Sequence, residues 1–126
     1  MTRDGTILVG DSGNSCIRCI SPSGVHEVTT LSGSEGPVEA RFVMGIAVDA
    51  KGVIVYSEFF DHRIRAVKDG QVITLAGHER GYADGEGDAA RFYCPGYLTL
   101  DHEGNILVSD FYNFNVRKIC ARLCSF

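Results

Sequence analysis

Short runs of β-branched and aliphatic residues recur along the chain, each bounded by Gly, Asn, Asp or Pro. Such runs, separated by turn residues at even spacing, are typical of the strands of an all-β domain. No segment keeps a helical period beyond a single turn, which we expect at Asp88–Phe92 with Asp88 as its N-cap. The expected strands lie near Ile7–Gly10, Ser15–Ile20, Glu27–Leu31, Gly45–Asp49, Val53–Ser57, Arg63–Val67, Val72–Ala76, Tyr97–Asp101, Ile106–Asp110 and Asn115–Ile119.

The strand pattern is written almost three times. Gly5–Gly33 aligns with Gly52–Gly77, and both align with Gly104–Ile119. The repeat length is 47 residues from Gly5 to Gly52 and 52 residues from Gly52 to Gly104. Self-similarity at this period predicts a solenoid, a propeller or an array, in which each unit buries its apolar faces against its neighbours.

The length difference lies mainly in the loop that follows Gly33 or Gly77. The triplet Ala-Arg-Phe ends this loop in both copies, as Ala40–Phe42 and as Ala90–Phe92. We therefore expect Phe42 and Phe92 to be equivalent and to pack between neighbouring units.

The second unit supplies four strands, "GIAVD", "VIVYS", "RIRAV" and "VITLA", which we label a to d. Four antiparallel strands in a repeat of about 45 residues form the blade of a β-propeller. The first unit lacks strand a and the third lacks strand d. We place units at residues 5–33, 34–77 and 78–119 of a single domain spanning 1–126, with a divergent tail at 120–126.

The segment "GYADGEGDAARFYCPGYLTLDHEGNILVSDFYNFNVRKI" resembles the NHL repeat, whose pattern runs G-x-x-D-G-x-x-x-A-x-F, then P-G-ϕ-x-ϕ-D, then G-N-ϕ-ϕ-V-x-D-x-x-N-x-x-ϕ-R-K-ϕ. The resemblance extends to "DHRIRAVKDGQVITLAG" and, more loosely, to "DSGNSCIRCISPSGVHEVTTLSG", so it covers Gly5–Ile119. It departs at Met44-Gly45, where the usual Pro is missing, and at Glu58, which replaces the usual Asp. The resemblance implies an NHL-type propeller of about five or six blades, of which this chain holds roughly half.

A half ring has two open blade edges, which favour pairing with other chains. We interpret the chain as a fragment or truncated product of a longer propeller. The alternative is self-association into a homodimeric ring. Joining two copies would duplicate strands b and c rather than rebuild one blade, which disfavours that alternative.

Composition changes this picture little. The 126 residues carry a net charge of -4, which disfavours a general phosphate-binding surface. No apolar run approaches the roughly 20 residues that span a bilayer, and no signal peptide is recognisable, so we expect no membrane partner. The five cysteines do not form a disulfide framework. We therefore expect a reducing, cytoplasmic location.

An acid and an arginine recur seven residues apart in every unit, as Asp11/Arg18, Glu58/Arg65 and Asp110/Arg117. The acid ends strand b and the arginine lies in strand c of the same hairpin. Asn14, Asp61 and Asn113 follow the acids by three residues, where a short polar side chain can bond its own turn. Recurrence in each unit favours a structural clamp over a ring of ligand-binding charges.

We find no constellation for catalysis, metal or cofactor binding. Asp84, Glu86 and Asp88 suggest a calcium loop, but their spacing does not fit an EF-hand. Cys16 and Cys19 point to opposite faces of a strand and do not suit one zinc ion, and Cys120 and Cys124 lie at the far end. NHL-like lyases use histidine-bound metal, and the histidines here show no such spacing.

The best functional signal is aromatic. The b–c and d–a connections of a blade emerge on one face, and we expect Tyr93, His78 and the candidate partner-binding residues there. Exposed aromatic side chains are enriched at binding interfaces, although packing between blades is the competing explanation. The candidates are Phe59, Phe60, His62, Arg63, Tyr82, Phe111, Tyr112 and Phe114.

These observations favour a non-catalytic scaffold that binds a protein or peptide through this face, with no cofactor. One alternative is binding of single-stranded RNA, in which Arg63, Phe59 and Phe60 would stack on bases. Another is a fragment of an NHL-like hydrolase or lyase. For that enzyme, the innermost strands offer only Asp49 and Asp101 toward a central channel.

Overall fold

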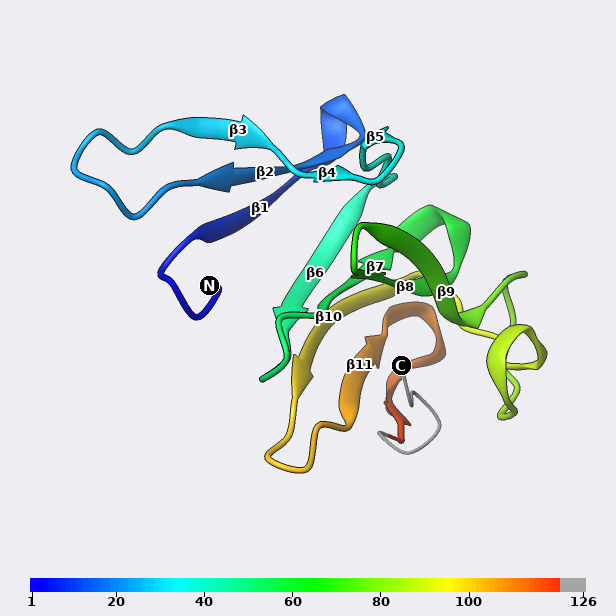
Figure 1. Ribbon diagram of the computed structural model, residues 1–126. Coiled ribbons are helices and arrows are strands. Elements are labelled where there is room, and N and C mark those ends of the chain that lie inside the picture. Colours follow the sequence, from blue (N-terminus) through cyan, green and yellow to red (C-terminus); the bar gives the residue numbers. More distant parts are fainter. Residues whose placement is uncertain (121–126) are drawn as a thin grey trace.

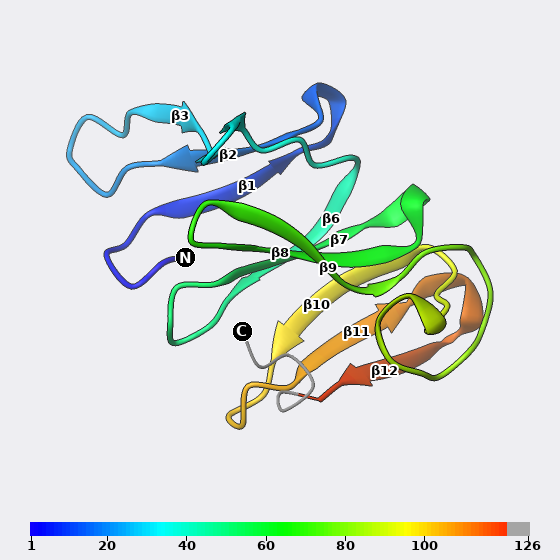
Figure 2. The ribbon, with the colours of Figure 1, turned by 45° about the vertical axis from the view of Figure 1, so that its right-hand side comes forward.

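The computed structural model describes residues 1–120 and is all-β, as expected, with three small antiparallel sheets that contact one another in sequence order (Figures 1 and 2). The first sheet holds β1 (Ile7–Asp11), β2 (Cys16–Ile20) and β3 (Val28–Thr30). The second holds β6 (Val43–Val48), β7 (Ile54–Glu58), β8 (Arg63–Lys68) and β9 (Gln71–Gly77). The third holds β10 (Pro95–Leu100), β11 (Ile106–Asp110) and β12 (Asn115–Ile119).

Every expected strand is present, and the sheets have the strand orders bcd, abcd and abc. A small hairpin of β4 (Ser32–Gly33) and β5 (Gly36–Pro37) was not expected. Three short 3-10 helices follow the b strands: η1 (Ser12–Asn14), η2 (Phe59–Asp61) and η4 (Phe111–Asn113). The divergent tail lies outside the described residues, apart from Cys120.

The turn expected at Asp88–Phe92 is displaced. The 3-10 helix η3 covers Gly87–Ala89, its N-cap residue is Glu86, and no side chain caps it by a hydrogen bond. Asp88 therefore lies inside the turn and does not cap it. The reason is that Ala90 is already extended (φ -71°, ψ 148°), and Arg91 and Phe92 form β-bridges with Ala83 and Arg80.

The blades meet most closely at their innermost strands, because β6 contacts both β1 and β10. Gly45 of β6 lies against the backbone of β10: a Cβ at this position would be 2.7 Å from the Leu98 nitrogen. Ser57 joins the same two strands. Its hydroxyl accepts a hydrogen bond from the Gly45 amide (3.0 Å) and donates one to the Gly96 carbonyl (2.7 Å).

Two apolar clusters fill the spaces between the sheets. Ile17, Val43 and Tyr56 lie between the first and second sheets. Ile64 and Phe92 lie with Val108 and other residues between the second and third. The core is therefore shared between units, as the repeat predicts.

Compared with the four-stranded second sheet, and among the described residues, the first sheet lacks a strand beside β1 and the third lacks a strand beside β12. Within residues 1–120, β1 pairs only with β2, and β12 pairs only with β11. In the same range, no helix has the length and apolar character needed to cross a membrane.

The two Ala-Arg-Phe triplets are not equivalent in the structure. The Phe59 amide donates to the Phe42 carbonyl (3.2 Å), and the matching Phe111 amide donates to the Cys94 carbonyl (3.3 Å). Phe42 and Cys94 both have a left-handed backbone, with φ of 42° and 53°. Phe42 thus corresponds to Cys94, two residues beyond Phe92. Phe92 is buried between blades, but the expectation that Phe42 packs there too is wrong, because its side chain is 40% exposed.

We predict that Ser57→Ala lowers the free energy of unfolding by about 1–3 kcal/mol, because two buried backbone groups lose their partner. Ser109→Ala is the matched control: this hydroxyl occupies the same place in the third blade and donates only to Tyr97 within its own sheet, at 3.2 Å. We expect the control to change stability by less than about 0.5 kcal/mol. Urea denaturation measures both, and equal losses would contradict the inter-blade role.

Candidate functional site: an aromatic surface at the b–c turns

Each b–c connection is a tight turn of the same construction. Strand b ends at an acid, a 3-10 helix follows, and the next residue takes a left-handed conformation. These left-handed residues are Ser15, His62 and Phe114, with φ between 54° and 56°. The left-handed step turns the chain back into strand c, so the side chains of η2 and η4 project from one end of the blades.

In the second and third units the acid of the turn is buried and also holds the d–a connection. Glu58 and Asp110 are almost completely buried. The Glu58 carboxylate accepts a hydrogen bond from the Arg41 amide at 2.7 Å, and Asp110 accepts one from the Tyr93 amide at 2.8 Å. Because one carboxylate joins the b–c turn to the d–a connection, the two connections are fixed at the same end of the sheets.

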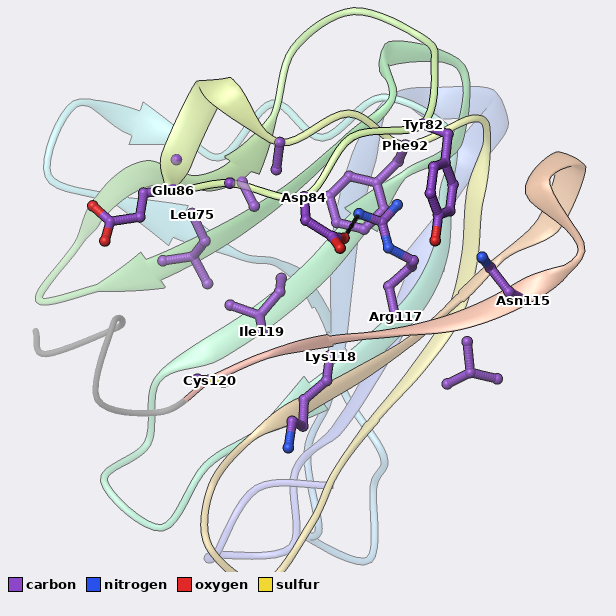
Figure 3. A pocket seen from close by; sticks show the side chains of 15 residues that line it. Leu75, Tyr82, Asp84, Glu86, Phe92, Asn115, Arg117, Lys118, Ile119 and Cys120 are labelled. Atoms are coloured by element: carbon purple, nitrogen blue, oxygen red, sulfur yellow. Dashed lines mark hydrogen bonds and ion pairs between the residues drawn. The ribbon is translucent and has the colours of Figure 1, made fainter.

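The acid–arginine clamp is most complete in the third unit. The Arg117 guanidinium donates to Asp110 (3.0 Å), to Asp84 (2.6 Å) and to the carbonyls of Arg91 (3.0 Å) and Ala83 (2.9 Å). Tyr82 lies over it at 4.6 Å (Figure 3). Arg117 therefore ties strand c to the long connection, and Asp84 is its carboxylate partner there.

The clamp differs in the other units. In the first, Arg18 donates to Asp11 at 3.2 Å, and about a third of each side chain is exposed. In the second, Arg65 reaches Glu58 only at 3.7 Å.

The short polar residue three positions after the acid explains this difference. Asn14 and Asn113 donate to the acids of their own turns, at 2.9 and 2.7 Å. Asp61 stands at this position in the second unit and cannot donate while ionised. Arg63 takes over: its Nε donates to Glu58 at 2.6 Å and it pairs with Asp61 at 3.6 Å.

The turns bring six aromatic rings together in what we call the aromatic surface. Successive rings are in contact, with centroid distances of 4.7 Å for Phe42–Phe60, 5.0 Å for Phe59–Phe60, 6.0 Å for Phe59–Phe111, 5.0 Å for Phe111–Tyr112 and 5.1 Å for Tyr93–Tyr112. Phe60 is 61% exposed and Phe111 58% exposed. The rings thus pack on one another and still present apolar area to solvent.

The structure sorts the eight candidate residues. Phe59, Phe60, Phe111 and Tyr112 belong to the aromatic surface, and His62 borders it, with its ring 5.7 Å from that of Tyr93. Arg63 is engaged in ion pairs with Glu58 and Asp61 and contacts no ring of the surface among the described residues. Two candidates lie apart from it. Tyr82 packs on Arg117, and the highly exposed Phe114 contacts no other ring among the described residues.

Tyr82 instead lines a groove of about 400 Å³ beside β12, together with Leu75, Asp84 and Arg117 (Figure 3). Within residues 1–120, no three His, Cys, Asp or Glu side chains are grouped in a way that could hold a metal ion.

Sequence reasoning missed Phe42 as a surface residue, because the repeated triplet suggested burial. The usable signal was its distance from strand a. Phe42 directly precedes Val43, the first residue of β6, just as Cys94 directly precedes Pro95, the first residue of β10. Counting back from the first residue of strand a correctly pairs Phe42 with Cys94, whereas aligning the identical Ala-Arg-Phe triplets wrongly pairs it with Phe92.

Burial is the largest cause of a pKa shift at two groups of this region, His62 and Cys94. Burial and then the charge of Arg80 hold the pKa of His62 below its ordinary value, against the opposing effect of Asp61 and Asp110. The His62 Nδ1 accepts a hydrogen bond from the Cys94 amide at 3.0 Å, which requires that nitrogen to be unprotonated. Burial, followed by the charge of Asp110, raises the pKa of the Cys94 thiol above its ordinary value.

Comparison with solved structures identifies the fold as part of a β-propeller. No protein-family model matches the chain, and no curated protein matches it by sequence. A protein of unknown function from Bacteroides thetaiotaomicron is similar in structure over 91% of this chain and 32% of its own length, with a TM-score of 0.79 and 23% identity.

An auxiliary nutrient binding protein from the same organism is similar over 91% of this chain and 34% of its own length (TM-score 0.74, 18% identity). A streptogramin B lyase is similar over 96% and 36% (TM-score 0.70, 16% identity). The chain thus spans about a third of the length of these proteins. At these identities the likeness shows the fold alone.

We predict that Arg117→Leu destabilises the chain by about 3–5 kcal/mol, because the buried Asp110 carboxylate would lose its positively charged partner. Arg18→Leu removes the same clamp in the first unit, where both charges reach solvent, and should cost about 1 kcal/mol or less. Urea denaturation compares the two. If Arg117→Leu does not fold, Arg117→Lys should fold with a lower free energy of unfolding than the wild type. Equal losses of stability in Arg117→Leu and Arg18→Leu would contradict the clamp.

We also predict that stability falls as the pH is lowered through the titration range of His62. The pKa of the unfolded histidine is about 6.5, and that of the folded one lies below it. The unfolded chain therefore binds the proton more readily. The stabilisation is complete above the unfolded pKa and is lost as the pH falls through the folded pKa.

Denaturation midpoints from pH 7.5 to 5, and the pH titration of the His62 ring by NMR, measure this effect. His62→Gln should weaken the dependence, whereas exposed His102→Gln should leave it unchanged. A folded-state pKa at or above the unfolded value would rule the mechanism out.

Proposed function

We propose that this chain is a segment of an NHL-type β-propeller that acts as a non-catalytic binding module, and that its aromatic surface contacts a protein or peptide. The observation that carries the proposal is the exposure of Phe60, Phe111 and Tyr112 within one continuous group of rings. Aromatic rings of this kind supply large contact area with few rotatable bonds, and they dominate the energetics of many protein interfaces.

The way the rings are held supports the same proposal. The turns that carry them are anchored by Glu58 and Asp110, so little backbone ordering remains to be done on binding. The exposed rings also lie next to one another, and contiguous exposed apolar area marks interaction sites more reliably than scattered residues do.

Among the similar structures, both binding proteins and lyases occur on this architecture. We favour a binding role because the features gathered at the b–c face are apolar and aromatic. Three side chains there that could act in acid–base chemistry, Glu58, Asp110 and His62, are engaged in hydrogen bonds that hold the turns.

The test is selection of peptides from a random displayed library against the purified chain. We expect enriched peptides to bind the wild type and to bind the double variant Phe60→Ser/Phe111→Ser about tenfold more weakly or worse, since two large contact residues are lost. The double variant should keep the wild-type circular dichroism and melting temperature, because both side chains are largely exposed.

Tyr97→Ser is the matched control, because Tyr97 is an equally exposed aromatic residue on the innermost strand β10. A random pool of single-stranded RNA is selected in parallel. Enrichment of RNA that depends on Phe60 and Phe111 would replace the proposal with RNA binding. Peptides that bind Phe60→Ser/Phe111→Ser as tightly as they bind Tyr97→Ser would contradict the aromatic surface as the site.

A further inference from the structure

Three arginines line a small hollow next to the aromatic surface. The open hollow has a volume of about 210 Å³ and is lined by Arg41, Arg63 and Arg65 together with Glu39 and Glu58. Arg41 directly precedes Phe42 and Glu58 directly precedes Phe59, so the hollow adjoins the aromatic surface through two consecutive pairs of residues.

Arg65 is the unusual member of this group. Its side chain is about four-fifths buried, and it makes no hydrogen bond with any residue in the described range 1–120. Its nearest carboxylate oxygen belongs to Glu58 at 3.7 Å, and its Nε is buried without a partner. The Glu58 carboxylate instead accepts hydrogen bonds from Arg63 at 2.6 Å and from the Arg41 amide at 2.7 Å. A guanidinium has five donors, and leaving them unpaired inside a protein is unfavourable.

The third unit shows what is missing. Arg117 occupies the same position in its strand, opposite Val108 as Arg65 is opposite Tyr56, and it binds the carboxylate of Asp84 at 2.6 Å. That carboxylate comes from the long connection between Gly77 and Cys94. The corresponding connection of the second unit, from Gly33 to Phe42, is eight residues shorter (17 against 9) and has no residue equivalent to Asp84.

We propose that the hollow receives a carboxylate of the bound partner, an Asp or Glu side chain, in the place that Asp84 takes beside Arg117. This inference rests on the proposed function, because the hollow adjoins the surface that the partner would cover. Arg65 supplies the charge and the planar set of donors that suits a carboxylate, and such charge-assisted hydrogen bonds are among the stronger ones in proteins.

Acidic residues of the chain near the hollow compete with a partner's carboxylate for the arginines. Asp61 is held by Arg63 at 3.6 Å. Glu39 lies at the rim, 72% exposed, and pairs with the exposed Arg41 at 3.4 Å. An exposed pair of this kind is weak, so Glu39 is the carboxylate of the chain that competes with an incoming one.

The first experiment follows the arginine Nε–Hε resonances of the full chain by ¹⁵N NMR during titration with propionate, the carboxylate of a glutamate side chain. Propionamide is the neutral control of the same shape. We expect propionate to move the Arg65 resonance and to raise the melting temperature, and propionamide to do neither. An Arg65 resonance that does not respond to propionate would overturn the proposal and leave ordered water as its partner.

Variants assign the effect to the hollow. Arg65→Met should weaken propionate binding about tenfold or more, whereas Arg18→Met, at the same position of the first unit, should not change it. Glu39→Gln should tighten binding about threefold, because it removes the competing carboxylate. Glu39→Gln keeps the test decisive even if Arg65→Met fails to fold. An unchanged affinity of Glu39→Gln for propionate would contradict the assignment of the hollow.

A last comparison separates a partner's side chain from a free small carboxylate. The capped tripeptide Phe-Glu-Phe should bind about tenfold more tightly than capped Phe-Gln-Phe and than propionate, and Phe60→Ser/Phe111→Ser should remove its advantage over propionate without changing propionate binding. If the tripeptide is no better than propionate, the partner assignment is wrong. If peptides selected on the aromatic surface bind without any effect of Arg65, the proposed function stands and this inference falls.

Discussion

The buried carboxylate at the end of strand b is the group on which the rest of the binding face depends. An ionised group in the interior must be fully hydrogen-bonded, because an unpaired buried charge is very unfavourable. Glu58 and Asp110 meet this requirement with donors from their own hairpin and from the backbone of the preceding connection. One residue thereby fixes both the b–c turn and the preceding d–a connection. The aromatic residues that directly follow it are therefore held in a defined position.

Around this fixed group the units differ in a coordinated way. The second unit has Asp61 where the other two have Asn. There Arg63 donates to the acid in place of the Asn, and Arg65 lies 3.7 Å from the acid. Where the connection is long, Asp84 reaches the equivalent Arg117. The repeat keeps its backbone while the contacts that satisfy the charge are exchanged, which allows neighbouring blades to present different surfaces.

The sequence was sufficient for the strands, their order and the repeat, because alternation of apolar residues and turn chemistry are local signals. It also located the turns that carry Phe59, Phe60, Phe111 and Tyr112. It failed where a contact joins distant residues of loops that differ in length. The pairing of Asp84 with Arg117 spans 33 residues, and the two-residue offset between Phe42 and Phe92 is invisible when identical letters are aligned. Tyr82 was misplaced for the same reason, since the long connection carries it to the edge of β12.

The contact at Gly45 has a geometric consequence for the assembly of sheets. At Gly45 only hydrogen atoms separate the backbone of β6 from that of β10, whereas farther out the rings and methyl groups of Phe92, Ile64 and Ala90 occupy the gap between the same two sheets. Each sheet with its filling is therefore a wedge, thin toward the axis and thick toward the periphery. Stacked wedges curve around an axis, and their taper sets how far each blade rotates from the last. A single methyl group at position 45 would thicken the thin end and open that curvature.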